Sequence, residues 1–201
     1  MLFIKRVMLS MFVVFFISTM SVVNGYAADA ISKDDALVDV FGPNYSFSTE
    51  TVRLQGEKLD KIIERLGGKL VYEQIGSESK TVEAHKKIEF HYAMRDGEKI
   101  GVGIVDMQPG KWGPVEFMIA VMLDDPLPKV KRIEVMSMQE RRGRPIARSS
   151  YMKQYVGKTT ENPLEVGEDI IAITGATISS RAASFSVKKA LVLVEECIYQ
   201  K

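Results

Sequence analysis

The chain has 201 residues, of which 46% are hydrophobic and 26% are charged, and its formal net charge is +1. This length and balance predict one globular domain of ordinary size, alone or with a small appendage, and exclude wholesale disorder. No concentrated basic face is evident, so we expect no nucleic acid among the partners. Cys197 is the only cysteine, which excludes an internal disulfide, a haem attached through cysteines and an iron–sulfur cluster. Any redox chemistry must therefore use an organic cofactor.

The first residues have the layout of an export signal. Lys5 and Arg6 precede an apolar run over residues 7–23, and small residues follow it. This layout predicts a signal peptide over residues 1–27, cleaved after Ala27. The run is near the lower length limit for spanning a bilayer, so an uncleaved anchor is the alternative. Under both interpretations the domain lies in the periplasm or elsewhere outside the cytoplasm, and under the second it stays anchored to the membrane.

Residues 28–85 are expected to form an N-terminal helical extension. A first helix is predicted over residues 32–40, because Ser32 can cap it and acidic residues occupy its first turn. A second helix is predicted over residues 57–66, where apolar residues recur on one face and two glycines follow.

The remaining residues, 86–201, are predicted to form an α+β domain in which an antiparallel sheet packs against helices. The turn Arg95-Asp96-Gly97-Glu98 is typical of a hairpin. Successive strands joined by such short turns pair in antiparallel fashion. The predicted strands cover residues 87–94, 100–107, 115–123 and 130–138.

Beyond residue 143 the succession of strands and short turns ends. A short helix is predicted over residues 149–156 and a further strand within residues 164–173. The last element is a long C-terminal helix over residues 180–199, where Ala183, Val187 and Leu191 belong to an apolar stripe.

The segment before this helix reads Ile-Thr-Gly-Ala-Thr-Ile-Ser-Ser over residues 173–180. A glycine can adopt a positive φ and let the backbone approach an anion closely. The N–H groups and the positive dipole end of a helix start stabilise negative charge. The segment therefore predicts a phosphate site. The alternative is an ordinary helix start in which Ser179 or Ser180 is the N-cap and Gly175 is a loop glycine.

Other motifs in the sequence give weaker evidence for a functional site. His85 and His91 would share one face of a strand about 20 Å apart, too far to bind one metal ion. Gly157-Lys158-Thr159 lacks the first glycine of a phosphate-binding P-loop, and Gly101-Val-Gly103 lacks the third glycine of a dinucleotide fingerprint. With two histidines in the chain and no nucleophile elbow, a hydrolytic triad has little support.

Four ordered pieces of the sequence resemble the FMN-binding domain family. This family includes the exported flavin subunits of Rnf and sodium-pumping NADH:quinone oxidoreductase complexes, and small stand-alone periplasmic proteins. The resemblance covers about residues 98–196 and implies that residues 86–201 are an FMN-binding domain. The pieces are Gly110-Lys-Trp-Gly113-Pro114-Val115, Glu140-Arg-Arg-Gly143, Gln154-Tyr-Val-Gly157-Lys158 and Thr174-Gly175-Ala176-Thr177.

The resemblance implies that a flavin transferase outside the cytoplasm links the phosphate of FMN to Thr177 as a phosphoester. In the family's usual pattern an acidic residue lies three positions before the first hydroxyl residue, where this chain has Ile171 and the nearest acid is Asp169. Trp112, Met118 and Glu140 are candidates for contact with the flavin ring on sequence position alone. The implied cofactor-binding residues are Thr174, Gly175, Ala176, Thr177, Ser179 and Ser180.

The implied function is that of an electron carrier or redox subunit between membrane or periplasmic partner proteins, rather than a stand-alone enzyme. No residue set for substrate chemistry is evident, so no catalytic residue is assigned. The alternative is a module that binds FMN without a covalent bond, or lacks flavin, and serves assembly or sensing in a membrane redox complex. Ile171 favours this alternative.

Overall fold

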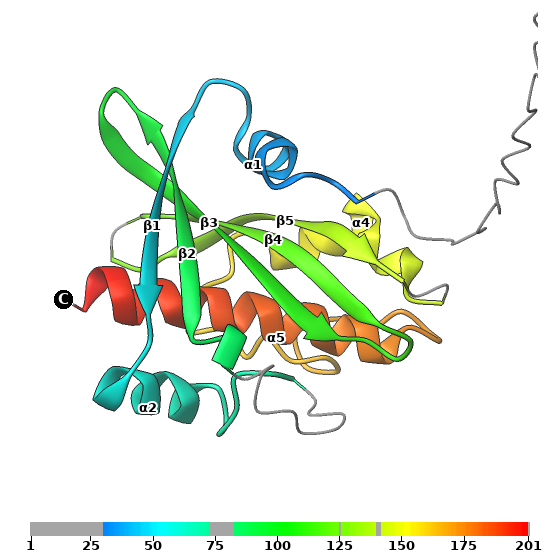
Figure 1. Ribbon diagram of the computed structural model, residues 1–201. Helices are drawn as coiled ribbons and strands as arrows, with labels where there is room; N and C mark the ends of the chain where they lie inside the picture. The colour runs from blue at the N-terminus through cyan, green and yellow to red at the C-terminus, as the bar shows by residue number, and fades with distance from the viewer. Residues whose placement is uncertain (1–29, 73–82, 125, 140–141, 201) are drawn as a thin grey trace, which may run out of the picture.

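The computed structural model describes residues 30–72, 83–124, 126–139 and 142–200 (Figure 1). The predicted signal peptide lies outside these residues. Five antiparallel strands form one sheet in the order β1-β2-β3-β4-β5. The predicted α+β class is therefore confirmed. The strands are β1 (Ser46–Arg53), β2 (Lys87–Arg95), β3 (Glu98–Pro109), β4 (Pro114–Met122) and β5 (Lys129–Met138).

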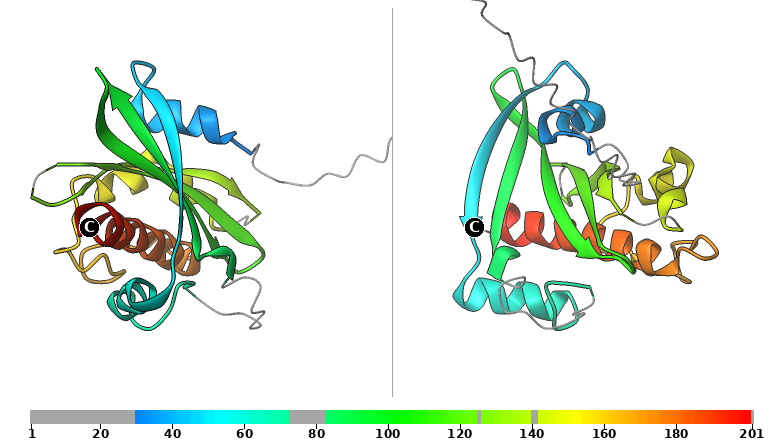
Figure 2. Two further views of the ribbon diagram at one scale, coloured as in Figure 1. Left: turned by 60° about the vertical axis from the view of Figure 1, so that its left-hand side comes forward. Right: turned by 45° about the vertical axis from the view of Figure 1, so that its right-hand side comes forward.

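Helices cover both faces of the sheet (Figure 2). Helix α1 (Lys33–Phe41) lies on one face, and α5 (Thr177–Val194) and α2 (Gly56–Arg65) lie on the other. A π-helical turn, η3 (Glu195–Tyr199), continues α5. Between β5 and α5 the chain forms η1 (Arg144–Ala147), α4 (Ser149–Met152) and η2 (Lys153–Tyr155). No helix in the described ranges combines the length and the apolar character needed to cross a bilayer.

The predicted start of α1 is confirmed. Ser32 is its N-cap, and the Ser32 hydroxyl accepts a hydrogen bond from the Asp35 N–H group. The helix packs closely on β3 because Gly101 and Gly103 have no side chains there. A Cβ atom at Gly103 would lie 2.6 Å from Leu37 Cδ2. The two glycines therefore make room for a helix rather than for a nucleotide.

Strand β1 was not predicted. It lies at an edge of the sheet, pairs with β2 along its whole length, and is mostly exposed. Its Ser, Thr and Glu side chains lack the apolar alternation by which a strand is recognised. The predicted helical extension thus also contributes a strand to the sheet.

The four strands predicted from residue 87 onward are confirmed, and so is the turn between the first two. Asp96 and Gly97 both have positive φ values, 54° and 84°, as the two-residue type I′ hairpin requires. The predicted strand within residues 164–173 is wrong. This segment forms turns with one isolated bridge between Val166 and Ile170.

Helix α5 begins at Thr177, three residues before its predicted start, and its buried side lies on the sheet. One side chain on that side is charged. Lys189 is 1% exposed, and its Nζ atom donates to Asp106 Oδ1 at 2.6 Å and to His85 Nδ1 at 2.8 Å. The other carboxylate oxygen of Asp106 accepts from Gln108 and Ser186. Burial alone would raise the pKa of Asp106, but Lys189 and these hydrogen bonds hold it well below its usual range.

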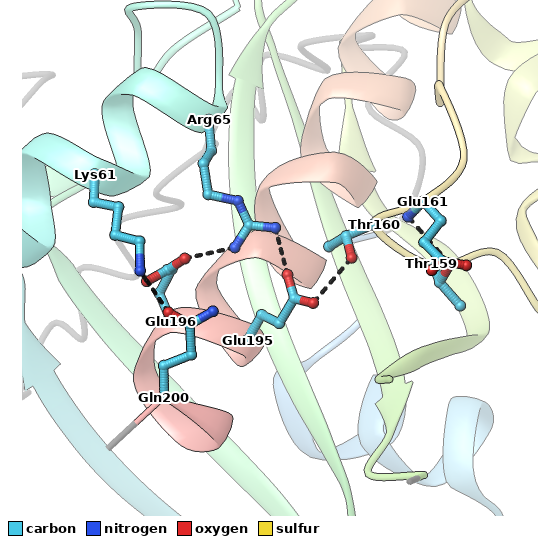
Figure 3. A network of polar contacts seen from close by, with 8 residues as sticks. All are labelled: Lys61, Arg65, Thr159, Thr160, Glu161, Glu195, Glu196 and Gln200. Carbon is cyan, nitrogen blue, oxygen red and sulfur yellow. Dashed lines mark hydrogen bonds and ion pairs between the residues drawn. The ribbon is translucent and has the colours of Figure 1, made fainter. Parts of the chain in front are cut away.

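A second polar cluster joins α2 to the end of α5 (Figure 3). The Arg65 guanidinium bonds the carboxylates of Glu195 and Glu196, and Lys61 Nζ lies 3.1 Å from Glu196 Oε2. Thr160 donates to the remaining oxygen of Glu195 at 3.1 Å. The two glutamates are 9% and 2% exposed, so their charges are compensated within the chain. This cluster fixes α2 against the end of α5.

Candidate functional site

The candidate site is the turn that leads into α5. The N–H group of Ala176 donates to the carbonyl of Ile173 at 2.9 Å, which closes a four-residue turn. Gly175 occupies the third position of this turn with a φ of 81°. A type II turn requires a positive φ at this position, which glycine adopts without strain. The positive φ fits both predicted roles of Gly175, close approach of the backbone to an anion and an ordinary loop glycine.

The first turn of α5 has no side-chain cap. Ala176 is the N-cap residue, and the first helical hydrogen bond runs from the Ser180 N–H group to the Ala176 carbonyl at 2.9 Å. The helix provides no acceptor for the N–H groups of Thr177 and Ile178. The alternative in which Ser179 or Ser180 caps the helix is therefore wrong. An anion at this position would meet N–H donors and the positive end of the helix dipole.

The six predicted cofactor-binding residues divide by exposure. Thr174, Gly175 and Thr177 are exposed, so an external group can reach them. Ala176, Ser179 and Ser180 are 3%, 1% and 0% exposed. The first three therefore present the surface of the turn, and the second three lie beneath it.

Ser180 belongs to a buried chain of hydroxyl groups. Its Oγ atom accepts from the Ile173 N–H group at 3.4 Å and bonds the Tyr151 hydroxyl. The Tyr151 hydroxyl lies 3.2 Å from that of Tyr155, which lies 3.1 Å from Ser184 Oγ. Burial raises the pKa of both tyrosines, so they remain neutral hydrogen-bonding groups. These hydrogen-bonded hydroxyl groups support the turn from its buried side, and the sequence did not predict them.

The loop before the turn is held by side chains of the segment 154–158. The Gln154 amide oxygen accepts from the Ile171 N–H group at 2.8 Å, and its nitrogen donates to the Ile171 carbonyl at 3.4 Å. Lys158 Nζ bonds Asp169 Oδ2 at 2.8 Å. The sequence signal for these contacts is the piece Gln154-Tyr-Val-Gly157-Lys158, which resembles the family. The resemblance by itself assigns no function to Gln154 or Lys158.

Asp169 and Ile171 differ in what they present to solvent. The Asp169 carboxylate also accepts from the Glu165 N–H group at 2.9 Å. Burial by itself would raise its pKa, but Lys158 and the backbone donors lower it. The Ile171 side chain, in contrast, is 82% exposed. Asp169 thus serves the fold of the loop, whereas the side chain at position 171 faces solvent.

The three candidates for contact with a flavin ring fall in different places. Trp112 is 68% exposed on the turn between β3 and β4. This turn lies at the same end of the molecule as the start of α5 (Figure 1). Met118 is fully buried in the core beneath α1, so it cannot contact a ring at the surface. Glu140 lies outside the described residues.

Metal binding has no support in the described residues. No group of three His, Cys, Asp or Glu side chains there could hold a metal ion. The expectation that His85 and His91 share a face is wrong. His85 precedes β2 and contacts Lys189 on the α5 side, whereas His91 bonds Thr49 on β1 and lies toward the α1 side.

One comparison with known proteins identifies a family over this part of the chain. Residues 110–192 match the family model of the FMN-binding domain. This segment runs from the turn between β3 and β4 into α5, and it contains every residue of the candidate site. A search of proteins with curated functions gives no match. Residues 110–192 of this chain are therefore an FMN-binding domain, and FMN is its cofactor.

Proposed function

We propose that this chain is an extracytoplasmic electron-transfer protein whose FMN is attached through its phosphate to Thr177. The observation that supports this most is the exposed hydroxyl of Thr177 in the uncapped first turn of α5. A phosphate bound to Oγ1 would sit beside the N–H groups of that turn, where its charge is stabilised. The residues present therefore fit a phosphate group.

Attachment replaces the proton of the Thr177 hydroxyl by the phosphoryl group of an activated flavin nucleotide. The Oγ1–P bond forms as the bond from phosphorus to the leaving group breaks, and the proton passes to a base of the flavin transferase. Gly175 lets the turn approach the phosphate, while Ser180 and Tyr151 hold the turn in place. The bound flavin supplies the redox chemistry, and the protein supplies attachment and orientation.

The location outside the cytoplasm rests on the predicted signal at residues 1–27. A covalent bond suits such a protein, because a flavin lost by dissociation outside the cell membrane is diluted. The partners that we propose are a flavin transferase and membrane or periplasmic redox proteins. No substrate chemistry is assigned to the chain itself.

The test is co-expression with a flavin transferase, followed by denaturation and mass spectrometry of the intact chain. We expect the flavin fluorescence to remain with the denatured polypeptide, and the mass to rise by that of FMN less one water. Thr177→Ala should abolish both signals, and Thr177→Ser, which keeps a hydroxyl, should retain them. Flavin that is released on denaturation of the wild-type chain would contradict attachment.

A second candidate function is a module that binds FMN without a covalent bond. The exposed Ile171 side chain favours it, because the usual transferase pattern has an acid there. Ile171→Asp should raise the fraction of covalently modified chain if recognition of this loop limits attachment. Ile171→Asn introduces a side chain of nearly the same size as aspartate but without its charge, so it should not raise the modified fraction. Equal fractions for wild type and Ile171→Asp would show that position 171 does not limit attachment.

A further inference from the structure

A pocket lies between the segment that follows α2, residues 164–166 and residues 181–188 of α5. It encloses about 460 Å³, a volume within the range of small-molecule sites. Its walls include Lys69 and Tyr72 from the N-terminal part of the chain and Arg181, Phe185 and Lys188 from α5. The pocket is thus built jointly by the FMN-binding domain and by residues that precede it.

Two aromatic rings form part of the wall. The ring centroids of Tyr72 and Phe185 are 6.1 Å apart, and the rings are tilted by 50°. Lys69 Nζ lies 5.1 Å from the Tyr72 centroid and 5.8 Å from the Phe185 centroid. A planar ring entering the pocket would therefore meet aromatic surface with a cation beside it.

The charges of the lining are unbalanced. Lys188 Nζ lies 3.6 Å from Glu165 Oε1, the one carboxylate of the lining. Lys69 and Arg181 form no ion pair within the part of the chain that the structure describes. Two cations without a carboxylate partner thus flank two rings, a combination that suits an anion carried on an aromatic ring.

The pocket is distinct from the proposed phosphate site but close to it. Arg181 follows Thr177 by one helical turn, or about 6 Å along the axis. Lys69 and Tyr72 lie outside the segment 110–192 that matches the FMN-binding family. The pocket therefore depends on residues that the matched family model does not include.

We infer that this pocket binds a small aromatic acid, separate from FMN. The ring of the ligand lies against Tyr72 and Phe185, and its carboxylate is bound by Arg181 and Lys69. Arg181 and Phe185 are four residues apart on α5 and so are neighbours on one face of the helix. This spacing suits a carboxylate attached directly to the ring. The inference does not depend on covalent attachment at Thr177.

The test is calorimetric titration of the full chain with 2-naphthoate, before and after loading with flavin. We expect saturable binding of one naphthoate per chain in both forms. Arg181→Gln and Lys69→Gln should each weaken binding at least tenfold. Arg181 is exposed, so its replacement should leave the thermal melt unchanged. Lys58→Gln, an exposed position of α2 outside the pocket, is the matched control and should leave binding unchanged.

Two further ligands test the chemistry of the site. Naphthalene-2-carboxamide has the ring without the charge, and cyclohexanecarboxylate has the charge without the aromatic ring. Both should bind at least tenfold more weakly than 2-naphthoate. Absence of saturable naphthoate binding, or equal binding of the carboxamide, would overturn the inference. Loss of binding on flavin loading would also overturn it, because the pocket would then hold the flavin ring itself.

Discussion

The two ends of α5 differ in whether their polar groups have partners within the chain. At the end of the helix, Glu195 and Glu196 are nearly buried, and Arg65, Lys61 and Thr160 satisfy their carboxylates. At the start, no side chain caps the helix, and Thr177 is exposed.

This difference separates residues that hold the fold from residues that are available to a ligand. A buried carboxylate without a partner would cost several kcal/mol, so the chain supplies a partner for each one. Uncapped N–H groups at an exposed helix start can instead be solvated or bind an anion. We therefore expect substitutions in the second half of α5 to change stability and substitutions in the first turn to change flavin attachment.

The largest effect on stability is expected for Lys189. Lys189→Met keeps the length of the side chain but leaves Asp106 buried without its cation, which should cost about 3–5 kcal/mol of unfolding free energy. The measurement is urea denaturation followed by circular dichroism. Lys188→Met, on the neighbouring residue with a half-exposed ion pair, should cost less than about 1 kcal/mol. Similar losses for the two variants would contradict the role assigned to Lys189.

The same cluster predicts how stability depends on pH. Lys189 and its neighbours lower the pKa of Asp106 in the folded chain below its unfolded value. The stabilisation is therefore complete above the unfolded pKa of about 4 and is lost as the pH falls through the lower, folded value. Urea midpoints between neutral pH and pH of about 2 should fall for the wild type, with Asp169 and Glu196 contributing in the same direction.

A double variant tests how much of the acid sensitivity of stability comes from Asp106. The double variant Asp106→Asn/Lys189→Met removes both buried charges, so its urea midpoint should fall less between neutral and acidic pH than that of the wild type. An equal fall in both proteins would assign the acid sensitivity to other carboxylates.

A smaller effect is expected for Arg65. Arg65→Met retains the apolar stem and removes one partner of each glutamate, while Lys61 and Thr160 remain. We expect a loss of about 1–3 kcal/mol in unfolding free energy, since the glutamates are mostly buried but keep other donors. Lys61→Met is the control, and its half-exposed ion pair should contribute less than about 1 kcal/mol. A larger loss for Lys61→Met than for Arg65→Met would reverse this assignment.

The elements with a regular pattern were predictable from the sequence. Apolar alternation located β2 and β5, a continuous apolar run located β4, and the Asp96-Gly97 turn placed β3 after β2. The apolar stripe located α5. Strand β1 was not predictable in this way, because an exposed edge strand of polar residues has no apolar alternation. The strand predicted within residues 164–173 failed because local turns prevailed, with Asp169 bonding the Glu165 N–H group.

The exposed residues of the candidate site were predicted from the sequence, but the buried contacts that hold the turn in place were not. A short motif identified Thr174, Gly175 and Thr177, which the fold leaves exposed. The contacts of Ser180 with Tyr151 and of Gln154 with Ile171 join segments far apart in the sequence, and periodicity cannot pair them. Burial of Ser180 was foreseeable, because it lies three residues before Ala183 and so continues the apolar stripe.

Gly175 tests the turn itself. Gly175→Ala places a Cβ atom on a residue with a φ of 81°, and no heavy atom beyond the two adjacent residues lies within 4 Å of that Cβ position. The cost is therefore one of backbone conformation alone, about 1–2 kcal/mol for an L-residue in the left-handed region. We expect that loss in urea denaturation, together with reduced covalent flavin. Unchanged stability would mean that the turn readily adopts another conformation.

Thr177 should have the smallest effect on stability. Its side chain is exposed and no side chain caps this helix, and alanine favours a helix more than threonine does, so Thr177→Ala should change the unfolding free energy by less than about 0.5 kcal/mol. Ser32→Ala is the contrasting variant, because it removes a true N-cap and should cost about 1 kcal/mol. If Thr177→Ala were as destabilising as Ser32→Ala, Thr177 would belong to the structure of α5. If its stability is unchanged while covalent flavin is lost, the hydroxyl serves attachment, and the two ends of the helix differ in function as well as in polarity.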